Sequence, residues 1–92
     1  MIRLNCSLIT EDEDKRKKAI EKATELVAFS LRDKGCISYD LYGSLTNSDR
    51  LMIVETWESE EDLKAHSESE HFKRIVPELQ NLSKMTLEKF DF

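Results

Sequence analysis

The sequence predicts an α+β fold of the ferredoxin-like type, with the order βαββαβ and a four-stranded antiparallel sheet. Residues 1–9 alternate between apolar and polar side chains, as a strand with one buried face does. Two later stretches repeat apolar residues at helical spacing, and three further strand-like runs complete the order. A chain of 92 residues has room for one hydrophobic core, so a single domain is expected.

The first helix is expected directly after the first strand. Thr10 or Asp12 can cap an amphipathic helix of about 20 residues, in which apolar side chains recur every three to four positions. Gly35 suits the left-handed position that ends such a helix.

Three further strands are expected to complete the sheet. The strands over residues 36–43 and 51–57 flank a turn at residues 46–49. The strand over 51–57 is apolar at nearly every position, which is typical of a strand covered on both faces. The last strand is expected over residues 84–92. In this fold the strands lie in the spatial order 4-1-3-2, and the helices cover one face.

Two helical pieces are expected between the third strand and the last. Ser59 is placed to cap the first piece, and Ser67 or Ser69 to begin the second. Pro77 lies inside the second pattern and is expected to kink or end that helix near Val76.

Strand parity assigns side chains to the two faces of the expected sheet. We expect Leu4, Cys6 and Leu8 to point away from the helices, together with Met52 and Val54. An apolar face of this size would have to be shielded from water. The simplest arrangement is a twofold homodimer in which the two sheets pack face to face.

A polar and aromatic group is expected on the opposite face, beneath the helices. The same parity places Asn5 near Glu55 and Trp57, and His66 follows on the helical piece that folds back over them. Buried polar groups need partners, so the group implies either mutual hydrogen bonds or a cavity. Each residue also has an ordinary explanation: Trp57 in the core, His66 at the surface and Asn5 as a strand residue.

Composition and charge exclude several classes of function. The 14 basic and 19 acidic residues give a net charge of −5, and no basic cluster suggests binding to nucleic acid or to an anionic membrane. No apolar run is long enough to span a membrane, and no signal peptide is visible, so a cytoplasmic location is expected. Cys6 and Cys36 are expected to be free thiols, because a strand separates them.

The sequence contains no motif for a cofactor or a metal. There is no nucleophilic triad, phosphate-binding glycine loop, flavin or nicotinamide motif. His66 and His71 are five residues apart with an expected helix break between them, so no zinc pair is predicted. We therefore expect neither a cofactor nor a metal.

Four motifs resemble the antibiotic biosynthesis monooxygenase (ABM) domain family. They are Gly35–Tyr42 (GCISYDLY), Ile53–Ser59 (IVETWES), Leu63–His66 (LKAH) and Ser69–Phe72 (SEHF), in this order. The resemblance spans nearly the whole chain and implies one domain over residues 1–92, with the dimeric α+β barrel of that family.

The resemblance implies a cofactor-independent monooxygenase that oxidises a quinol or polyphenol with O₂ in a pocket between the sheet and the helices. Asn5, Trp57 and His66 are the implied catalytic residues. His66 would be the base, Asn5 a hydrogen-bond donor to the phenolate oxygen, and Trp57 a surface on which the ring stacks. The implied substrate-binding residues are Tyr39, Glu55, Leu63, His71 and Phe72.

Other activities remain open within this resemblance. Similar proteins include isomerases or lyases of small oxygenated metabolites, and a non-catalytic ligand-binding dimer is a further alternative. A related group degrades haem, but the position of its axial histidine falls on Val76 here, so haem degradation ranks lower.

Overall fold

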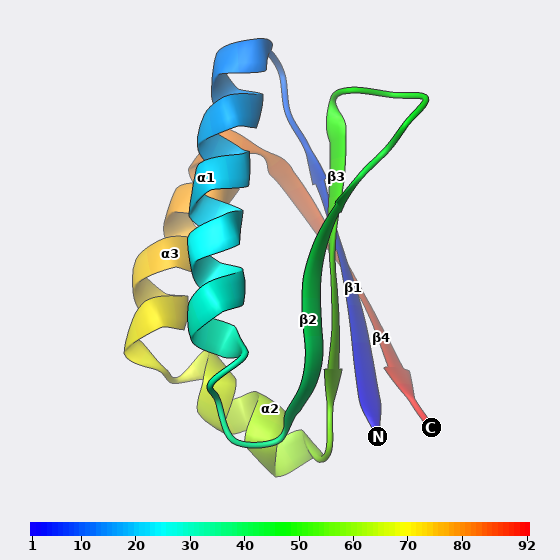
Figure 1. Cartoon of the computed structure of the whole chain (residues 1–92), viewed down its shortest axis with the longest axis vertical. Helices are drawn as coiled ribbons and strands as arrows, with labels where there is room; N and C mark the ends of the chain where they lie inside the picture. Colours follow the sequence, from blue (N-terminus) through cyan, green and yellow to red (C-terminus); the bar gives the residue numbers. More distant parts are fainter.

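The computed structural model describes residues 1–92 and has the expected ferredoxin-like architecture (Figure 1). The second helical region is divided in two, as its two serine caps predict. In chain order the elements are β1 (Ile2–Ile9), α1 (Glu13–Ser30), β2 (Cys36–Gly43), β3 (Arg50–Trp57), α2 (Glu60–Ser67), α3 (Glu70–Leu82) and β4 (Lys84–Asp91).

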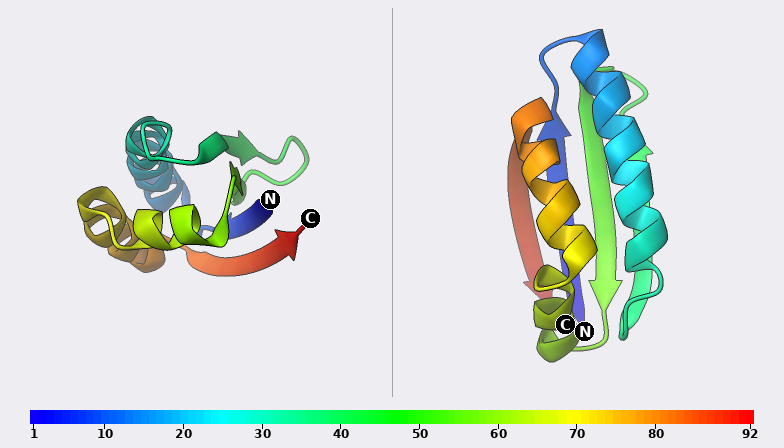
Figure 2. Two further views of the ribbon diagram at one scale, coloured as in Figure 1. Left: turned by 90° about the horizontal axis from the view of Figure 1, so that it is seen from below. Right: turned by 90° about the vertical axis from the view of Figure 1, so that its left-hand side faces the viewer.

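The four strands form one antiparallel sheet in the order β2-β3-β1-β4, which confirms the expected order. All three helices lie on one face of this sheet, and the other face is open (Figures 1 and 2). Strands β2 and β4 are the two edges. None of the three helices could span a membrane.

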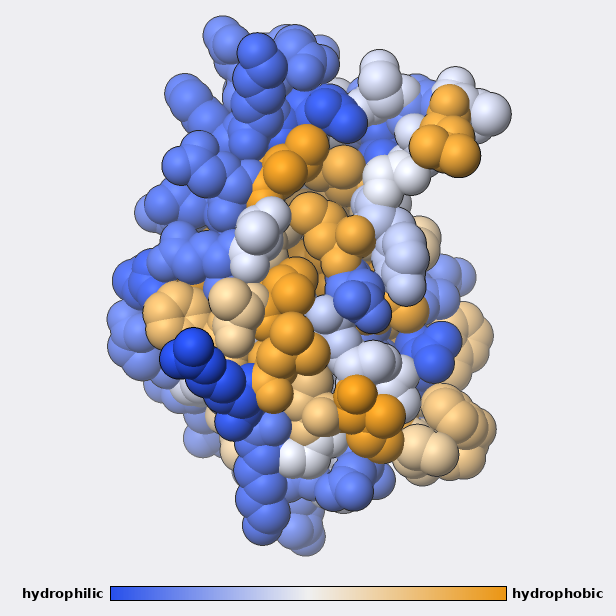
Figure 3. All heavy atoms as spheres, in the orientation of Figure 1, coloured by the Kyte–Doolittle hydropathy of each residue, from blue (hydrophilic) through white to orange (hydrophobic).

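The core lies between the sheet and the helices. It joins alternate residues of β1 and β3 to the inner sides of α1 and α3, where Ala19, Ala23, Ile75 and Leu79 are fully buried. The small alanines let α1 approach the sheet closely. Where α1 meets the sheet, apolar atoms form a band down the middle of the molecule (Figure 3).

The expected assignment of sheet faces is wrong for β1. Leu4 pairs with Glu55 and Cys6 with Ile53, and directly paired residues share a face. The even positions of β1 therefore face the helices, and Leu4, Cys6 and Leu8 are core residues. Met52 and Val54 lie on the open face.

The serine and aspartate caps form where they were expected. Asp12 caps α1, Ser59 caps α2 and Ser69 caps α3, each accepting a hydrogen bond from a backbone N–H three residues later. Because α1 ends at Ser30, Gly35 does not terminate it. Gly35 instead has a φ of +79° in the turn that leads into β2.

Of the two outcomes expected at Pro77, a kink or the end of the helix, the end does not occur. The helix continues from Glu70 to Leu82 through this residue. Pro77 lies on the exposed side of α3, where water can bind the carbonyl group that the missing N–H leaves free.

Candidate functional site

A cavity of about 590 Å³ lies between the sheet and helices α2 and α3. Its wall includes Cys6, Tyr39, Glu55, Leu63, His66 and Phe72. Leu87 of β4 faces the same side as Cys6 but is 60% exposed, so the cavity reaches solvent beside this edge strand. An exposed ion pair between Lys89 of β4 and Glu60 of α2 lies at the rim. A mostly apolar space with a few polar groups is typical of a small-molecule site.

Three aromatic side chains pack around the imidazole ring of His66. The His66 ring lies 4.5 Å from Trp57, 5.6 Å from Tyr39 and 5.3 Å from Phe72, measured between ring centres. Trp57 and His66 are almost completely buried, although they come from β3 and α2. His66 is therefore part of the cavity wall and not a surface residue.

Glu55 is a carboxylate inside this largely apolar environment. It is 5% exposed, and its Oε1 accepts a hydrogen bond of 2.9 Å from the indole Nε1–H of Trp57. Burial raises the pKa of Glu55 to about 7, although the Trp57 and Tyr39 side chains oppose this shift. At neutral pH both the charged and the neutral form are populated.

The thiol of Cys6 and the phenol of Tyr39 in the cavity wall stay protonated. Burial, followed by the nearby charge of Glu55, raises the pKa of the Cys6 thiol to about 11 and that of the Tyr39 phenol well above its usual range. Both cysteines are free, as expected. Glu55 is therefore the group of this wall that titrates near neutral pH, whereas burial lowers the pKa of His66 and keeps its ring neutral and able to accept a proton.

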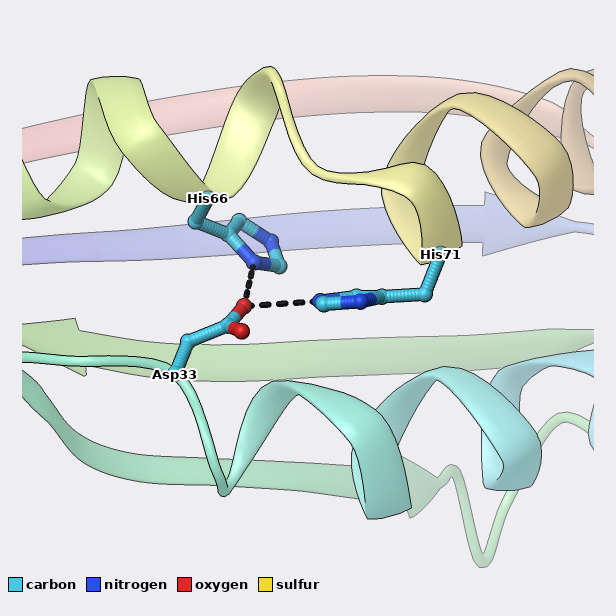
Figure 4. A group of neighbouring side chains, drawn as sticks. All are labelled: Asp33, His66 and His71. Carbon is cyan, nitrogen blue, oxygen red and sulfur yellow. Dashed lines mark hydrogen bonds and ion pairs between the residues drawn. The ribbon is translucent and has the colours of Figure 1, made fainter.

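Asp33 connects the two histidines at the end of the site. It lies in the turn between α1 and β2, and its Oδ2 is 2.7 Å from Nδ1 of His66 and 2.7 Å from Nε2 of His71. Figure 4 shows both rings reaching toward this carboxylate, one from the end of α2 and the other from the start of α3. The break between the two helices brings the histidines together.

Asp33, His66 and His71 are also residue types that bind metal ions. Their ligand atoms lie within 4.8 Å of one another. A histidine that binds a metal almost always donates its other ring N–H to an acceptor, but Nε2 of His66 is buried without a hydrogen-bond partner. The cluster therefore fits a hydrogen-bond network better than a metal centre.

The structure brings most of the expected site residues together. Six of them line the cavity or pack against its aromatic wall: Tyr39, Glu55, Trp57, Leu63, His66 and Phe72. His71 lies behind His66, on the other side of Asp33.

Asn5 is not part of this group, contrary to the expected geometry. It pairs with Val54 and with Glu88, so its side chain lies on the open face of the sheet. The cause is the same as for Leu4. The expected alignment of β1 with β3 put the odd positions of β1 on the helix side of the sheet, whereas the even positions lie there.

Asp33 was not expected from the sequence. It is 33 residues from His66 in a polar turn, and no spacing rule connects the two positions. Only the packing of the α1–β2 turn against the junction of α2 and α3 reveals it.

Comparisons with known proteins agree with this fold. The family model for antibiotic biosynthesis monooxygenase matches residues 8–78. A protein of Bacillus subtilis (strain 168) named "Putative monooxygenase YcnE" is 30% identical over 63 residues, which are 68% of this chain and 66% of that protein.

Two solved structures show the similarity in three dimensions. A Bacteroides thetaiotaomicron protein of unknown function, described as a possible oxidoreductase, is 48% identical with a TM-score of 0.95, over 99% of this chain and 96% of that one. SnoaB, a cofactor-independent oxygenase of Streptomyces nogalater, has a TM-score of 0.89 over 99% of this chain and 91% of its own. At 12% identity, the likeness to SnoaB shows a shared fold only.

Proposed function

The chain belongs to the antibiotic biosynthesis monooxygenase family, and from this premise we propose that it oxidises a quinol or polyphenol with O₂ without an added cofactor. The observation that carries the proposal is that Glu55 and His66 both lie in the wall of one largely apolar cavity. The pKa of Glu55 is raised to about 7 and that of His66 is lowered, so the wall offers a carboxylic acid that can donate a proton and a neutral imidazole that can accept one, as such a reaction requires.

The chemistry requires a substrate that can itself supply electrons to oxygen. Loss of a hydroxyl proton converts a quinol or an anthrone-type phenol into an electron-rich anion. The anion reduces O₂, one oxygen atom enters the product and the other leaves as water. The full reduction of O₂ takes four electrons, and the substrate provides all of them. A quinol thereby becomes a hydroxyquinone, and an anthrone becomes an anthraquinone.

The residues of the cavity can serve each of these steps. His66 would accept the hydroxyl proton, and the neutral form of Glu55 would donate a proton to the oxygen that leaves as water. Trp57 and Tyr39 close the wall behind these two groups, and the apolar surroundings keep the anion away from water.

The test is O₂ uptake by chelator-treated protein with a naphthohydroquinone or a dihydroxyanthrone as probe. We expect uptake above the protein-free rate and, with ¹⁸O₂, one labelled atom in each product molecule. His66→Ala should lower the rate by about 10²–10⁴-fold, the usual effect of losing a general base. Glu58→Gln is the control, because Glu58 follows β3 on the exposed surface.

Three outcomes would contradict this proposal. Turnover of a small oxygenated metabolite without O₂ would indicate an isomerase or lyase. Binding of a planar ligand without turnover would indicate a ligand-binding protein. Flavin or haem bound at stoichiometric occupancy would contradict the cofactor-free mechanism.

We also propose that the chain forms a homodimer through the open face of its sheet. This face carries the half-buried Met52 and Val54, with Tyr42 and Phe90 at 55% and 48% exposure. No helix covers it (Figure 2). A second copy packed face to face would bury these side chains. The sequence predicted such a dimer with Leu4 and Cys6 in the interface, whereas β1 contributes Asn5 and Ser7 to this face.

A further inference from the structure

One nitrogen of His66 is buried without any hydrogen-bond partner. The residue is 2% exposed, and its Nε2 contacts neither a polar side chain nor a backbone group at hydrogen-bond distance. Buried polar atoms are nearly always paired, so an unpaired one in a cavity wall calls for an explanation. The other ring nitrogen, Nδ1, is paired with Asp33 at 2.7 Å.

The Asp33 contact decides which nitrogen carries the proton in the neutral ring. A carboxylate oxygen can only accept, so Nδ1 has to be the N–H that donates to it. The opposite tautomer would place a lone pair against Oδ2 and would bury an unpaired N–H at Nε2. The doubly protonated ring is disfavoured, because burial lowers the pKa of His66 even though Asp33 opposes this shift.

Asp33 is itself held in place from its other side. The Nε2–H of His71 donates to the same oxygen, also at 2.7 Å. The His71 ring stacks on Phe29, with 5.5 Å between ring centres, and the Arg74 guanidinium lies 5.5 Å from the centre of the Phe29 ring. The carboxylate therefore has two donors and a fixed position.

Charged groups flank this arrangement on two sides. On the solvent side, a hollow of about 290 Å³ beside Asp33 and His66 is lined by Lys34, Glu61 and Asp62. On the cavity side the wall carries the buried Glu55 and the protonated Tyr39 and Cys6, with Lys64 and the ion-paired Glu60 and Lys89 among the other lining residues. Asp62 is already engaged with Ser59, so Asp33 is the carboxylate that pairs with the two rings.

We propose that Asp33, supported by His71, is a positioning residue that holds His66 in the Nδ1–H tautomer and leaves Nε2 free to accept the substrate's proton. The tautomer follows from the hydrogen bonds alone, whereas its role in turnover rests on the function proposed above. The catalytic triad uses the same principle, in which a carboxylate orients a histidine base that acts through its other nitrogen.

The tautomer can be read directly from the imidazole ¹⁵N shifts of the labelled full-length protein. The chain has two histidines, so the spectrum contains two rings, and His71→Phe assigns them. At a pH where both rings are neutral, we expect a protonated-type shift at Nδ1 of His66 and an unprotonated-type shift at Nε2. Free histidine favours the opposite tautomer.

Asp33→Leu tests the positioning role, because leucine has nearly the shape of aspartate but cannot accept a hydrogen bond from either ring. We expect the ring of His66 to change to the Nε2–H tautomer that free histidine favours, and O₂-dependent turnover to fall by about 10²–10⁴-fold. Asp14→Leu is the matched control, since Asp14 is exposed in the first turn of α1.

Each result has a definite meaning. A wild-type His66 with its proton on Nε2 would overturn the proposal, whether or not the protein consumes oxygen. A changed tautomer in Asp33→Leu with full turnover would overturn the positioning role and leave the proposed function standing. The expected tautomer in a protein without oxygenase activity would support the assignment of Nε2 as the free acceptor and refute the oxidation alone.

Discussion

Glu55 is the residue at which a chemically useful group most clearly lowers the stability of the fold. Burying a carboxyl group disfavours its charged form, and the side chains of Trp57 and Tyr39 compensate Glu55 only in part. A glutamine would fit the same space and accept the same bond. The acidic side chain therefore lowers the stability of the fold near neutral pH while providing a group that titrates there.

Glu55→Gln is expected to change the pH dependence of folding. The pKa of Glu55 rises from 4.5 to about 7 on folding, so the folded state binds the proton more tightly. The free energy of unfolding should therefore fall as pH rises from about 4.5 to 7, by up to about 3 kcal/mol, and then level off.

Urea unfolding of the wild type and Glu55→Gln between pH 4 and 8 measures this difference. The variant should lack the decrease, whereas Glu61→Gln, an exposed residue of α2, should retain it. Parallel curves for the wild type and Glu55→Gln would show that the Glu55 carboxyl titrates normally.

At the scale of the elements, the turn between α1 and β2 organises the site. Asp33 in this turn binds both histidines, and two residues later Gly35 approaches α2 so closely that a Cβ atom would overlap the side chain of Asp62. The carbonyl of Gly35 also accepts a hydrogen bond of 2.8 Å from the backbone N–H of Glu58. One short turn therefore fixes the end of β3, the start of α2 and the orientation of His66.

Gly35→Ala should destabilise the protein by about 1–3 kcal/mol, because alanine is strained at positive φ and its methyl group would displace Asp62. Gly43→Ala is the matched control. A Cβ at Gly43 meets only a Leu51 methyl group at an ordinary 3.7 Å, so this change should be neutral or slightly stabilising. Thermal unfolding of both variants tests the prediction, and equal melting temperatures would contradict it.

The elements themselves could be predicted from the sequence because their signals are local. Period-two and helical spacing, together with Ser59 and Ser69 as caps, predict every strand and helix. The phase between β1 and β3 could not be predicted, because β3 is apolar at consecutive positions and either face could have been the buried one. For this reason Trp57 and His66 were placed correctly, whereas Asn5 was not.

At the scale of the whole molecule, the helices leave one side of the sheet uncovered. The uncovered side mixes apolar residues such as Val54 with hydrogen-bonded polar residues, including an Arg3–Thr56 contact of 2.7 Å. This composition is more polar than a core and more apolar than an ordinary surface. It is consistent with the interface between copies that we propose.

Val54→Asp should shift the protein from a dimer to a monomer, because it would place a charge at the centre of the proposed interface. Ala28→Asp makes the same kind of change on the exposed side of α1 and should leave the mass unchanged. Light scattering at micromolar concentration measures both masses, and circular dichroism shows whether each variant is folded. A wild-type protein that is already monomeric would contradict the interface.

The two attachments of α2 differ in how far they are exposed to water. Its start is connected to β4 by the exposed Glu60–Lys89 ion pair, and its end by the buried contact between His66 and Asp33. Exposed pairs contribute at most about 1 kcal/mol and are screened by salt. The contact at the β4 edge, where the cavity reaches solvent, is therefore the weaker of the two. Added salt should weaken this attachment of α2 to β4 and leave the contact that orients His66 largely unchanged.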